Sequence, residues 1–215
     1  YSRARNLHRA AQIVMSEHGG RLPSDPILLR KLPGIGRYTA GALASIAFNK
    51  DEPTLDGNIR RVISRIFNVV EPIGSAKSER LLWQLAGENL PSGKASTYNQ
   101  ALMELGAIIC TWQKPLCVDC PLSENCQAHV LNIQDKRPVR AHKANLPHYH
   151  FAAAVIEQEE RLLLTKRPSR GLLGGMWKFP GGEEHVIEGS VSSLEKEVQE
   201  ELGIEIKVGE LLDVF

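Results

Sequence analysis

The sequence Leu32-Pro33-Gly34-Ile35-Gly36 lies between two helical patterns and predicts how the first part of the chain folds. A helix start at Ser24-Asp25-Pro26 precedes it, and a helical pattern from Arg37 to about Phe48 follows it. Two glycines in so short a connection make a tight turn, whose backbone N–H groups can bind a phosphate together with the N-terminus of the next helix. An ordinary corner between two helices is the alternative, and the turn by itself favours neither.

Helical spacing of apolar residues continues on both sides of this turn, and no strand alternation occurs before about residue 131. The apolar stripe of Leu7, Ala10, Ala11, Val14 and Met15 is one example. Residues 132–148 contain scattered basic residues and two prolines with little periodicity, which predicts a linker. We therefore expect a mainly α domain over residues 1–131.

The sequence changes character after the linker. Phe151–Ile156 and Leu162–Lys166 are short apolar runs on either side of an acidic turn, which predicts a β-hairpin. A glycine-rich loop precedes a helix over about residues 192–202, and Ile204–Val208 alternates like a strand. We expect an α/β domain over residues 149–215 that is incomplete at its C-terminal end.

The charges are unevenly distributed along the 215 residues. The formal net charge is +1, from 26 Lys and Arg against 25 Asp and Glu. Residues 1–150 carry 19 basic and 12 acidic side chains, a balance of +7, and residues 151–215 carry 7 and 13, a balance of −6. Only the first part is suited to a polyanion such as DNA. No run approaches the ~18 apolar residues of a membrane span, so we expect no membrane partner.

The four cysteines, Cys110, Cys117, Cys120 and Cys126, fall in one segment with the spacing C-x6-C-x2-C-x5-C. Two disulfides are disfavoured, because nothing in the sequence is typical of a secreted protein and the apolar content suffices for a core. Zinc sites usually combine paired units, and only one C-x2-C occurs here. The uneven spacing of four thiolates therefore favours a [4Fe–4S] cluster over zinc.

Leu55-Asp56-Gly57-Asn58 precedes a helical stripe that contains Arg60, Arg61 and Arg65. An Asp or Asn in this position most often caps the helix. A carboxylate held beside a DNA-binding turn could also stabilise positive charge that develops on a deoxyribose as its base leaves. The basic helix itself could help to hold DNA.

These motifs, in this order and spacing, resemble the helix–hairpin–helix DNA glycosylases that carry an iron–sulfur cluster, and within them the adenine DNA glycosylase (MutY) family. The resemblance covers almost the whole chain and is carried by Leu32–Gly41, Leu55–Asn58 and the four cysteines. It implies a mainly α helix–hairpin–helix domain with a [4Fe–4S] loop, followed by the start of an α/β Nudix-like domain. It also implies that Cys110, Cys117, Cys120 and Cys126 hold the cluster and that DNA is contacted by Leu32, Pro33, Gly34, Ile35, Gly36 and Arg37.

The reaction that the resemblance implies is base-excision repair, by hydrolysis of the N-glycosidic bond of adenine paired with 8-oxoguanine or guanine. The adenine is flipped out of the duplex and protonated, and Asp56 stabilises the oxocarbenium-like sugar before water attacks. Tyr38 and Asn58 would support Asp56. The nearest alternative is an endonuclease III-like pyrimidine glycosylase and lyase, which has a nucleophilic lysine two residues after the last glycine of the hairpin. Tyr38 holds that position here and cannot form a Schiff base.

The general acid of the family is a Glu near a Gln-Gln-Thr motif, upstream of the stretch that Tyr1–Leu7 resembles. No such motif occurs in these residues, and the chain begins and ends within apparent elements. We therefore expect an internal fragment that lacks the proton donor and excises little or no adenine by itself.

The last part of the chain fits the spacing of the Nudix motif, with Lys196 where Nudix hydrolases have Arg; the fitting residues are Gly182, Glu188, Lys196, Glu197, Glu200, Glu201 and Gly203. Glu197, Glu200 and Glu201 share a helix face and could bind Mg²⁺, although a solvated acidic helix is the ordinary explanation. The resemblance implies a domain that recognises 8-oxoguanine through a hairpin expected beyond Phe215. A Mg²⁺-dependent nucleotide hydrolase stays open as an alternative.

The partner that the resemblance implies is double-stranded DNA with an A:8-oxoguanine or A:G mispair, bound by a monomer. A DNA-binding module without catalysis is a third function, since the turn and the cluster could serve binding alone. The implied location is the cytoplasm and nucleoid of a bacterium, or the nucleus or mitochondrion of a eukaryote.

Overall fold

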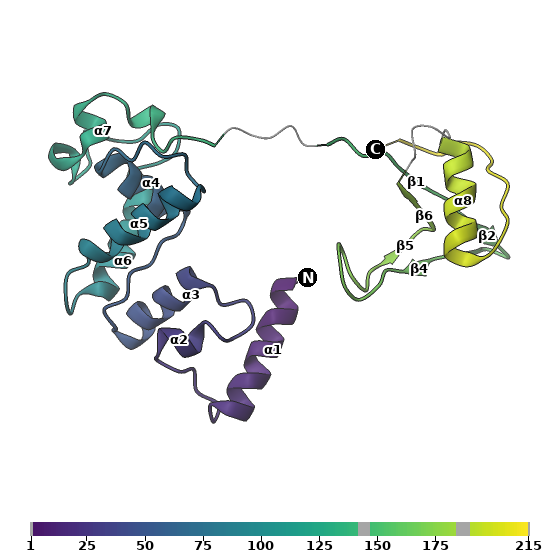
Figure 1. Cartoon of the computed structure of the whole chain (residues 1–215), viewed down its shortest axis with the longest axis horizontal. Coiled ribbons are helices and arrows are strands. Elements are labelled where there is room, and N and C mark those ends of the chain that lie inside the picture. Colours follow the sequence, from purple (N-terminus) through teal and green to yellow (C-terminus); the bar gives the residue numbers. More distant parts are fainter. Residues whose placement is uncertain (1, 142–146, 184–189, 215) are drawn as a thin grey trace. The chain divides into compact units, whose positions relative to one another are not determined.

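The computed structural model describes residues 2–141, 147–183 and 190–214, and the chain divides into two compact units, Tyr1–His142 and Lys143–Phe215 (Figure 1). Each unit has its own buried core. In the described ranges, no helix has both the length and the apolar character needed to cross a membrane.

The first unit consists of helices and turns, as the sequence predicts. Its α-helices are α1 (Ser2–Glu17), α2 (Pro26–Leu29), α3 (Arg37–Ala42), α4 (Gly57–Ile66), α5 (Ala76–Glu88), α6 (Ala95–Glu104) and α7 (Gln127–Val130). Two π-helical segments, η1 (Leu43–Ala47) and η2 (Leu105–Ile109), extend α3 and α6, and 3₁₀ turns form at Ser123–Asn125 and Gln134–Lys136.

Side chains near the helix starts explain why these starts could be predicted. Asp25 and Asp56 each accept a hydrogen bond of 2.7 Å from a backbone N–H group, that of Ile27 and that of Ile59 respectively. Each bond joins residues two or three positions apart and satisfies one of the N–H groups that a helix start leaves without a partner.

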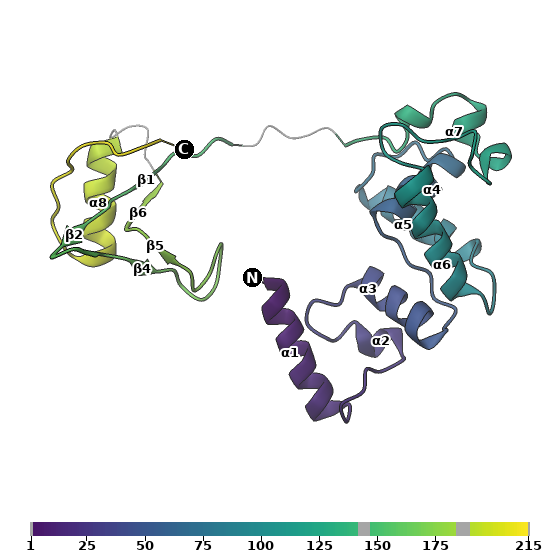
Figure 2. The same ribbon diagram turned by 180° about the vertical axis from the view of Figure 1, so that it is seen from behind.

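Two clusters of buried apolar side chains hold the first unit together. One joins α1 and α2 to α3 and η1 and consists of Ala10, Val14, Leu29, Leu32, Ala40 and Ala44. The other joins α4, α5 and α6 and consists of Leu55, Ile59, Val62, Ile63, Val69, Leu82, Ala86 and Leu102. Figures 1 and 2 show the same grouping, with α1–α3 at one end of the unit and α4–α7 at the other. Of the stripe predicted on α1, Leu7 and Met15 are exposed.

The second unit combines short antiparallel strand pairs with one helix. Its elements are β1 (Phe151–Ala153), β2 (Glu157–Gln158), β3 (Arg161–Leu162), β4 (Thr165–Lys166), β5 (Trp177–Lys178), β6 (Gly181–Glu183) and α8 (Ser190–Leu202). The pairs are β1 with β6, β2 with β3 and β4 with β5. Ala154, Leu194 and Val198 form the small core between α8 and the strands.

One strand prediction for this unit is confirmed in part and another is wrong. The predicted hairpin forms around the acidic turn, where β2 pairs with β3 and the N–H of Leu163 bonds to the carbonyl of Ile156 at 2.9 Å. The start of the first run, β1, pairs instead with β6, with Phe151 opposite Glu183. Residues 204–208 form no strand in the structure. Their alternation reflects one buried face, because Ile206 and Val208 pack against the core of α8. A strand also needs a paired edge, and the N–H of Val208 bonds instead to the Glu195 carboxylate at 3.3 Å.

The segment predicted as a linker belongs in part to the first unit. The guanidinium of Arg65 donates to the carbonyls of Gln134 and Arg137, and Ile73 donates to the carbonyl of Val139. The division between the units therefore falls between His142 and Lys143 and not at residue 131. Local sequence suggested a linker because these hydrogen bonds join residues about seventy positions apart, where periodicity gives no signal.

Candidate active site

Asp56 lies at the N-terminus of α4, where Oδ1 accepts the N–H of Ile59. The residue before it, Leu55, is fully buried and fixes the chain as it enters the helix. Asp56 itself is half-buried. The capping role suggested by the sequence is therefore present, but one hydrogen bond uses only part of the accepting capacity of a carboxylate. The carboxylate of Asp56 can therefore cap α4 and still have oxygen lone pairs to stabilise a positive charge nearby.

Tyr38 lies in the first turn of α3 and is connected to the segment that leads into Asp56. The buried hydroxyl of Thr54, two residues before Asp56, donates to the carbonyl of Tyr38 at 3.2 Å. The carbonyl of Pro53 occupies the space that a Cβ on Gly41 would need, so glycine permits the close approach of this segment to α3. The structure thus ties the helix that follows the glycine turn to the segment that carries Asp56.

Asn58 is connected to the first cysteine through Arg61. Nη2 of Arg61 donates to Oδ1 of Asn58 at 2.9 Å, and Nε donates to the carbonyl of Cys110 at 2.7 Å. The same guanidinium also donates to the carbonyl of Gly106. Burial lowers the pKa of Arg61, while the nearby Cys110 acts in the opposite direction. Hydrogen bonds of Arg61 therefore join the start of α4 to residues 110–130, which contain the four cysteines and are called the cysteine segment below.

The arginines of α4 correct the expectation that this helix presents its charges to DNA. Arg65 and Arg61 are only 2% and 8% exposed. Arg60 is partly exposed and forms an ion pair with Glu79 at 2.7 Å. All three guanidinium groups are thus engaged within the first unit. Sequence reasoning missed this because their acceptors, largely backbone carbonyls, come from distant segments.

Arg65 is the centre of the hydrogen bonds around the cysteine segment. Its guanidinium donates to the Sγ of Cys110 at 3.2 Å and to five backbone carbonyls, those of Cys110, Thr111, Trp112, Gln134 and Arg137. A buried charge is tolerated only where its donors are satisfied, and here the acceptors converge from both sides of α7 in the sequence. Arg65 therefore joins the cysteine segment to residues 134–137.

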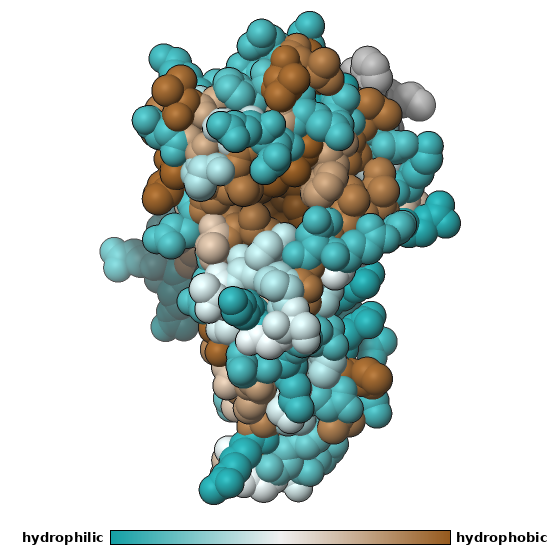
Figure 3. Space-filling view, turned by 90° about the vertical axis from the view of Figure 1, so that its left-hand side faces the viewer, coloured by the Kyte–Doolittle hydropathy of each residue, from teal (hydrophilic) through white to brown (hydrophobic). Residues whose placement is uncertain are grey.

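The four cysteine thiols interact with one another electrostatically. Burial raises the pKa of Cys117 and of Cys126, and the neighbouring Cys110 raises both further. In the ranges that the structure describes, no group of three or more His, Cys, Asp or Glu side chains is arranged as a metal site. The cysteine segment exposes apolar side chains such as Val118 and Val130, and Figure 3 shows hydrophobic residues gathered over the end of the first unit that carries α7.

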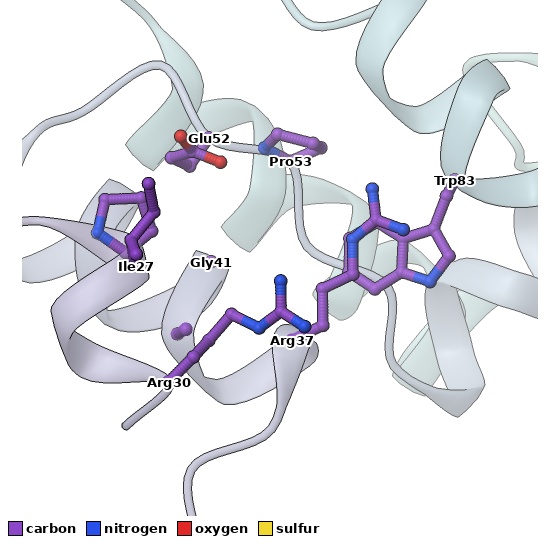
Figure 4. Close-up of a pocket in the computed structure, with 9 residues that line it drawn as sticks. Ile27, Arg30, Arg37, Gly41, Glu52, Pro53 and Trp83 are labelled. Atoms are coloured by element: carbon purple, nitrogen blue, oxygen red, sulfur yellow. The ribbon is translucent and has the colours of Figure 1, made fainter. Parts of the chain in front are cut away.

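The glycine turn has the geometry of a tight helix–hairpin–helix connection. Gly34 has φ of +80°, which favours glycine, and the N–H of Ile35 bonds to the carbonyl of Leu32 at 3.1 Å. The guanidinium of Arg37 lies over the ring of Trp83, 3.9 Å from its centroid (Figure 4). Sequence reasoning missed the role of Trp83. The predicted contact of Arg37 with DNA stays a prediction, and a DNA phosphate would compete with this stacking.

The Nudix motif residues that the structure describes lie on two elements. Gly182 belongs to β6, and Glu197, Glu200 and Glu201 belong to α8. Gly203 has φ of +70° and ends α8 with a hydrogen bond to the carbonyl of Gln199, as expected of a glycine after a helix. Glu188 lies outside the described residues.

Known proteins resemble both the second unit and the chain as a whole. Residues 151–215 match the NUDIX domain family. An adenine DNA glycosylase of Arabidopsis thaliana is 38% identical over 194 residues, which cover 84% of this chain and 31% of the plant protein. Those of Mus musculus and Homo sapiens are 31% and 33% identical, with 100% and 84% of this chain covered and 52% and 41% of theirs. This chain is thus similar to adenine DNA glycosylases over most of its length.

Solved structures confirm the helix–hairpin–helix glycosylase fold over about 60% of this chain. A thermostable thymine-DNA glycosylase matches with a TM-score of 0.53 and 35% identity, over 60% of this chain and 59% of that one. Endonuclease III in a non-covalent complex with DNA matches with a TM-score of 0.52 and 25% identity, over 62% and 60%. The chain spans about a third to a half of the length of the curated adenine DNA glycosylases named above.

Proposed function

We propose that the protein carrying this chain is a monofunctional glycosylase that removes adenine paired with 8-oxoguanine or guanine. The observation that carries the proposal is the carboxylate of Asp56, held at the start of α4 and connected through Thr54 to the helix that follows the glycine turn. Tyr38 supports it, because a phenol at this position cannot act as the amine nucleophile of a lyase. The family relationship supports adenine as the base that is removed.

In the proposed reaction, the C1′–N9 bond of the flipped nucleotide breaks and its electron pair leaves with the adenine, which a general acid protonates. The carboxylate of Asp56 stabilises the positive charge that develops at C1′. Water then forms the new C1′–O bond and loses a proton. Asn58, held by Arg61, keeps the start of α4 in position while this occurs.

The glycine turn, residues 32–36, is the proposed contact with the DNA backbone. Its backbone N–H groups and the start of α3 present partial positive charge to a phosphate. The similarity to endonuclease III, which was solved bound to DNA, supports this assignment. We also propose that the DNA contains an A:8-oxoguanine or A:G mispair and that the protein binds it as a monomer.

The experiment that tests the function measures base release from duplexes with a single A:8-oxoguanine, A:G or A:T pair, using a full-length protein that carries this chain. We expect adenine release from the first two duplexes and none from the third. Borohydride should trap no covalent protein–DNA complex, since Tyr38 offers no amine. Excision of an oxidised pyrimidine, or borohydride trapping of a protein–DNA complex through a lysine amine, would favour the endonuclease III-like alternative.

We further propose that Cys110, Cys117, Cys120 and Cys126 hold a [4Fe–4S] cluster. Four thiols within one short segment are the donors that such a cluster takes, and the guanidinium of Arg65 donates to the Sγ of Cys110 at 3.2 Å. When bound, the cluster supplies a rigid cross-link of this segment and no chemical step. The thiols and the two buried arginines then hold the cysteine segment against α4.

Purified protein should therefore be brown, absorb broadly in the visible range and contain about four iron and four sulfide per chain. We expect Cys117→Ser to lower the iron content and bleach the colour, because it removes one thiolate ligand. Val118→Ser, at a fully accessible neighbouring position, is the matched control and should keep both. A colourless protein with one zinc per chain would contradict the assignment.

A further inference from the structure

Glu201 of the Nudix motif is paired with a lysine of the same unit. Its Oε2 accepts a hydrogen bond from Nζ of Lys178 at 2.8 Å and one from the backbone N–H of Gly181 at 3.3 Å. The same ammonium group donates to the carbonyl of Gly181 at 2.7 Å. Lys178 thus connects the end of β5, the start of β6 and the C-terminal part of α8.

This ion pair lies at the surface of the second unit and is only partly shielded from solvent. The side chains of Lys178 and Glu201 are 23% and 27% exposed. Burial acts to raise the pKa of Glu201, but the hydrogen bonds from Lys178 and Gly181 help to outweigh it, and the net pKa is lowered. The carboxylate is therefore ionised at neutral pH and has its counter-charge within the protein.

The other two glutamates do not complete a cation site with Glu201. The carboxylate of Glu197 lies against Gly182, where an added Cβ would be 2.6 Å from its Oε2, and Glu200 is exposed. In residues 147–183 and 190–214, no three acidic, histidine or cysteine side chains converge as metal ligands. Mg²⁺ requires near-octahedral oxygen ligands at about 2.0–2.1 Å. The donor set described here does not fit that ion.

We propose that the ammonium group of Lys178 takes the place of the divalent cation in this Nudix-like unit. The lysine supplies a compact positive charge with three donors, which satisfies the carboxylate of Glu201 and the carbonyl of Gly181 together. The glutamate then serves to hold β5 and β6 against α8. A single positive charge that is already paired cannot bridge phosphate oxygens as Mg²⁺ does.

The inference is independent of adenine excision and is tested by metal binding and stability of the whole chain. Electron paramagnetic resonance of free Mn²⁺, added up to about 1 mM, should show no specific site in the unaltered chain. Lys178→Gln should lower the thermal unfolding temperature of the second unit. In this variant, Mn²⁺ at the same concentration should still show no specific site, because one carboxylate and one carbonyl do not supply the ligands that a divalent cation needs.

Matched variants separate this arrangement from a true metal site. Lys166→Gln removes a charge from the exposed lysine of the neighbouring strand β4 and should change neither stability nor Mn²⁺ binding. Glu201→Gln should destabilise the second unit, whereas Glu200→Gln on the same helix should not, because only Glu201 is paired with Lys178.

Specific Mn²⁺ binding by the unaltered chain that both Glu200→Gln and Glu201→Gln abolish would overturn the proposal. It is also overturned if Lys178→Gln leaves the unfolding temperature equal to that of Lys166→Gln. If Lys178→Gln does not fold, the comparison of Glu201→Gln with Glu200→Gln decides: equal stability of these two variants overturns it.

Discussion

Asp56→Asn, made in a full-length protein that carries this chain, is expected to lower adenine excision by about 10³-fold or more and to leave DNA binding unchanged. Asp and Asn have nearly the same shape but differ in charge. The amide oxygen of Asn can still accept the N–H of Ile59, so α4 keeps its cap and its position. The neutral amide cannot stabilise positive charge at C1′. The measurement is single-turnover release of adenine, with binding to a non-cleavable duplex measured in parallel.

The chain offers a matched control in Asp25→Asn. Asp25 also caps a helix, through a 2.7 Å bond to the N–H of Ile27, and lies outside the proposed reaction centre. This variant should excise adenine at the unaltered rate. Excision by Asp56→Asn within about tenfold of the unaltered protein would contradict the catalytic role. An equal loss in both variants would contradict a specific role of the negative charge at Asp56.

Arg65→Met is expected to destabilise the first unit by about 1–3 kcal/mol or more. Met fills a similar volume but donates no hydrogen bond, so the carbonyls that converge on Arg65 lose a shared donor in a site where water has little access. The cysteine segment and residues 134–137 should then separate from α4. Urea unfolding followed by the helical circular dichroism signal measures the loss, and proteolysis after residue 131 should become faster.

Arg60→Met, on the same helix, is the control for this loss. Arg60 forms a partly exposed ion pair with Glu79, and such pairs contribute about 0–1 kcal/mol. The stability of Arg65→Lys should lie between those of Arg65→Met and Arg60→Met, because an ammonium group keeps the charge but has fewer donors than a guanidinium. If Arg65→Met is no less stable than Arg60→Met, the guanidinium does not hold the segments together.

Much of the fold and the site could be predicted because the interactions concerned are local. The helix starts at Pro26 and Gly57 depend on caps two or three residues away, and Gly203 ends α8 through its own backbone conformation. The cysteine cluster was visible as a spacing within one segment. The identity of the second unit followed from spaced motif residues, and the family match over residues 151–215 confirms it.

The strand partners and the linker boundary could not be predicted in this way. A short apolar run indicates that a strand faces a core, but not which edge it joins, so the predicted hairpin does not show that β1 pairs with β6. The attachment of Gln134 and Arg137 to Arg65 leaves no periodic signal in the sequence. The C-terminal end of the first unit is therefore set by contacts between distant segments and not by local sequence.

The sequence by itself determined where the helices begin, which carboxylate precedes α4 and which four thiols lie together in the chain. Only the tertiary structure decided what the charged side chains do: Arg61 and Arg65 are buried at the cysteine segment, Arg37 stacks on Trp83, and Lys178 pairs with Glu201. The physical reason is that a cap needs atoms two or three residues away, whereas the partner of a charge is set by segments that meet only when the chain has folded.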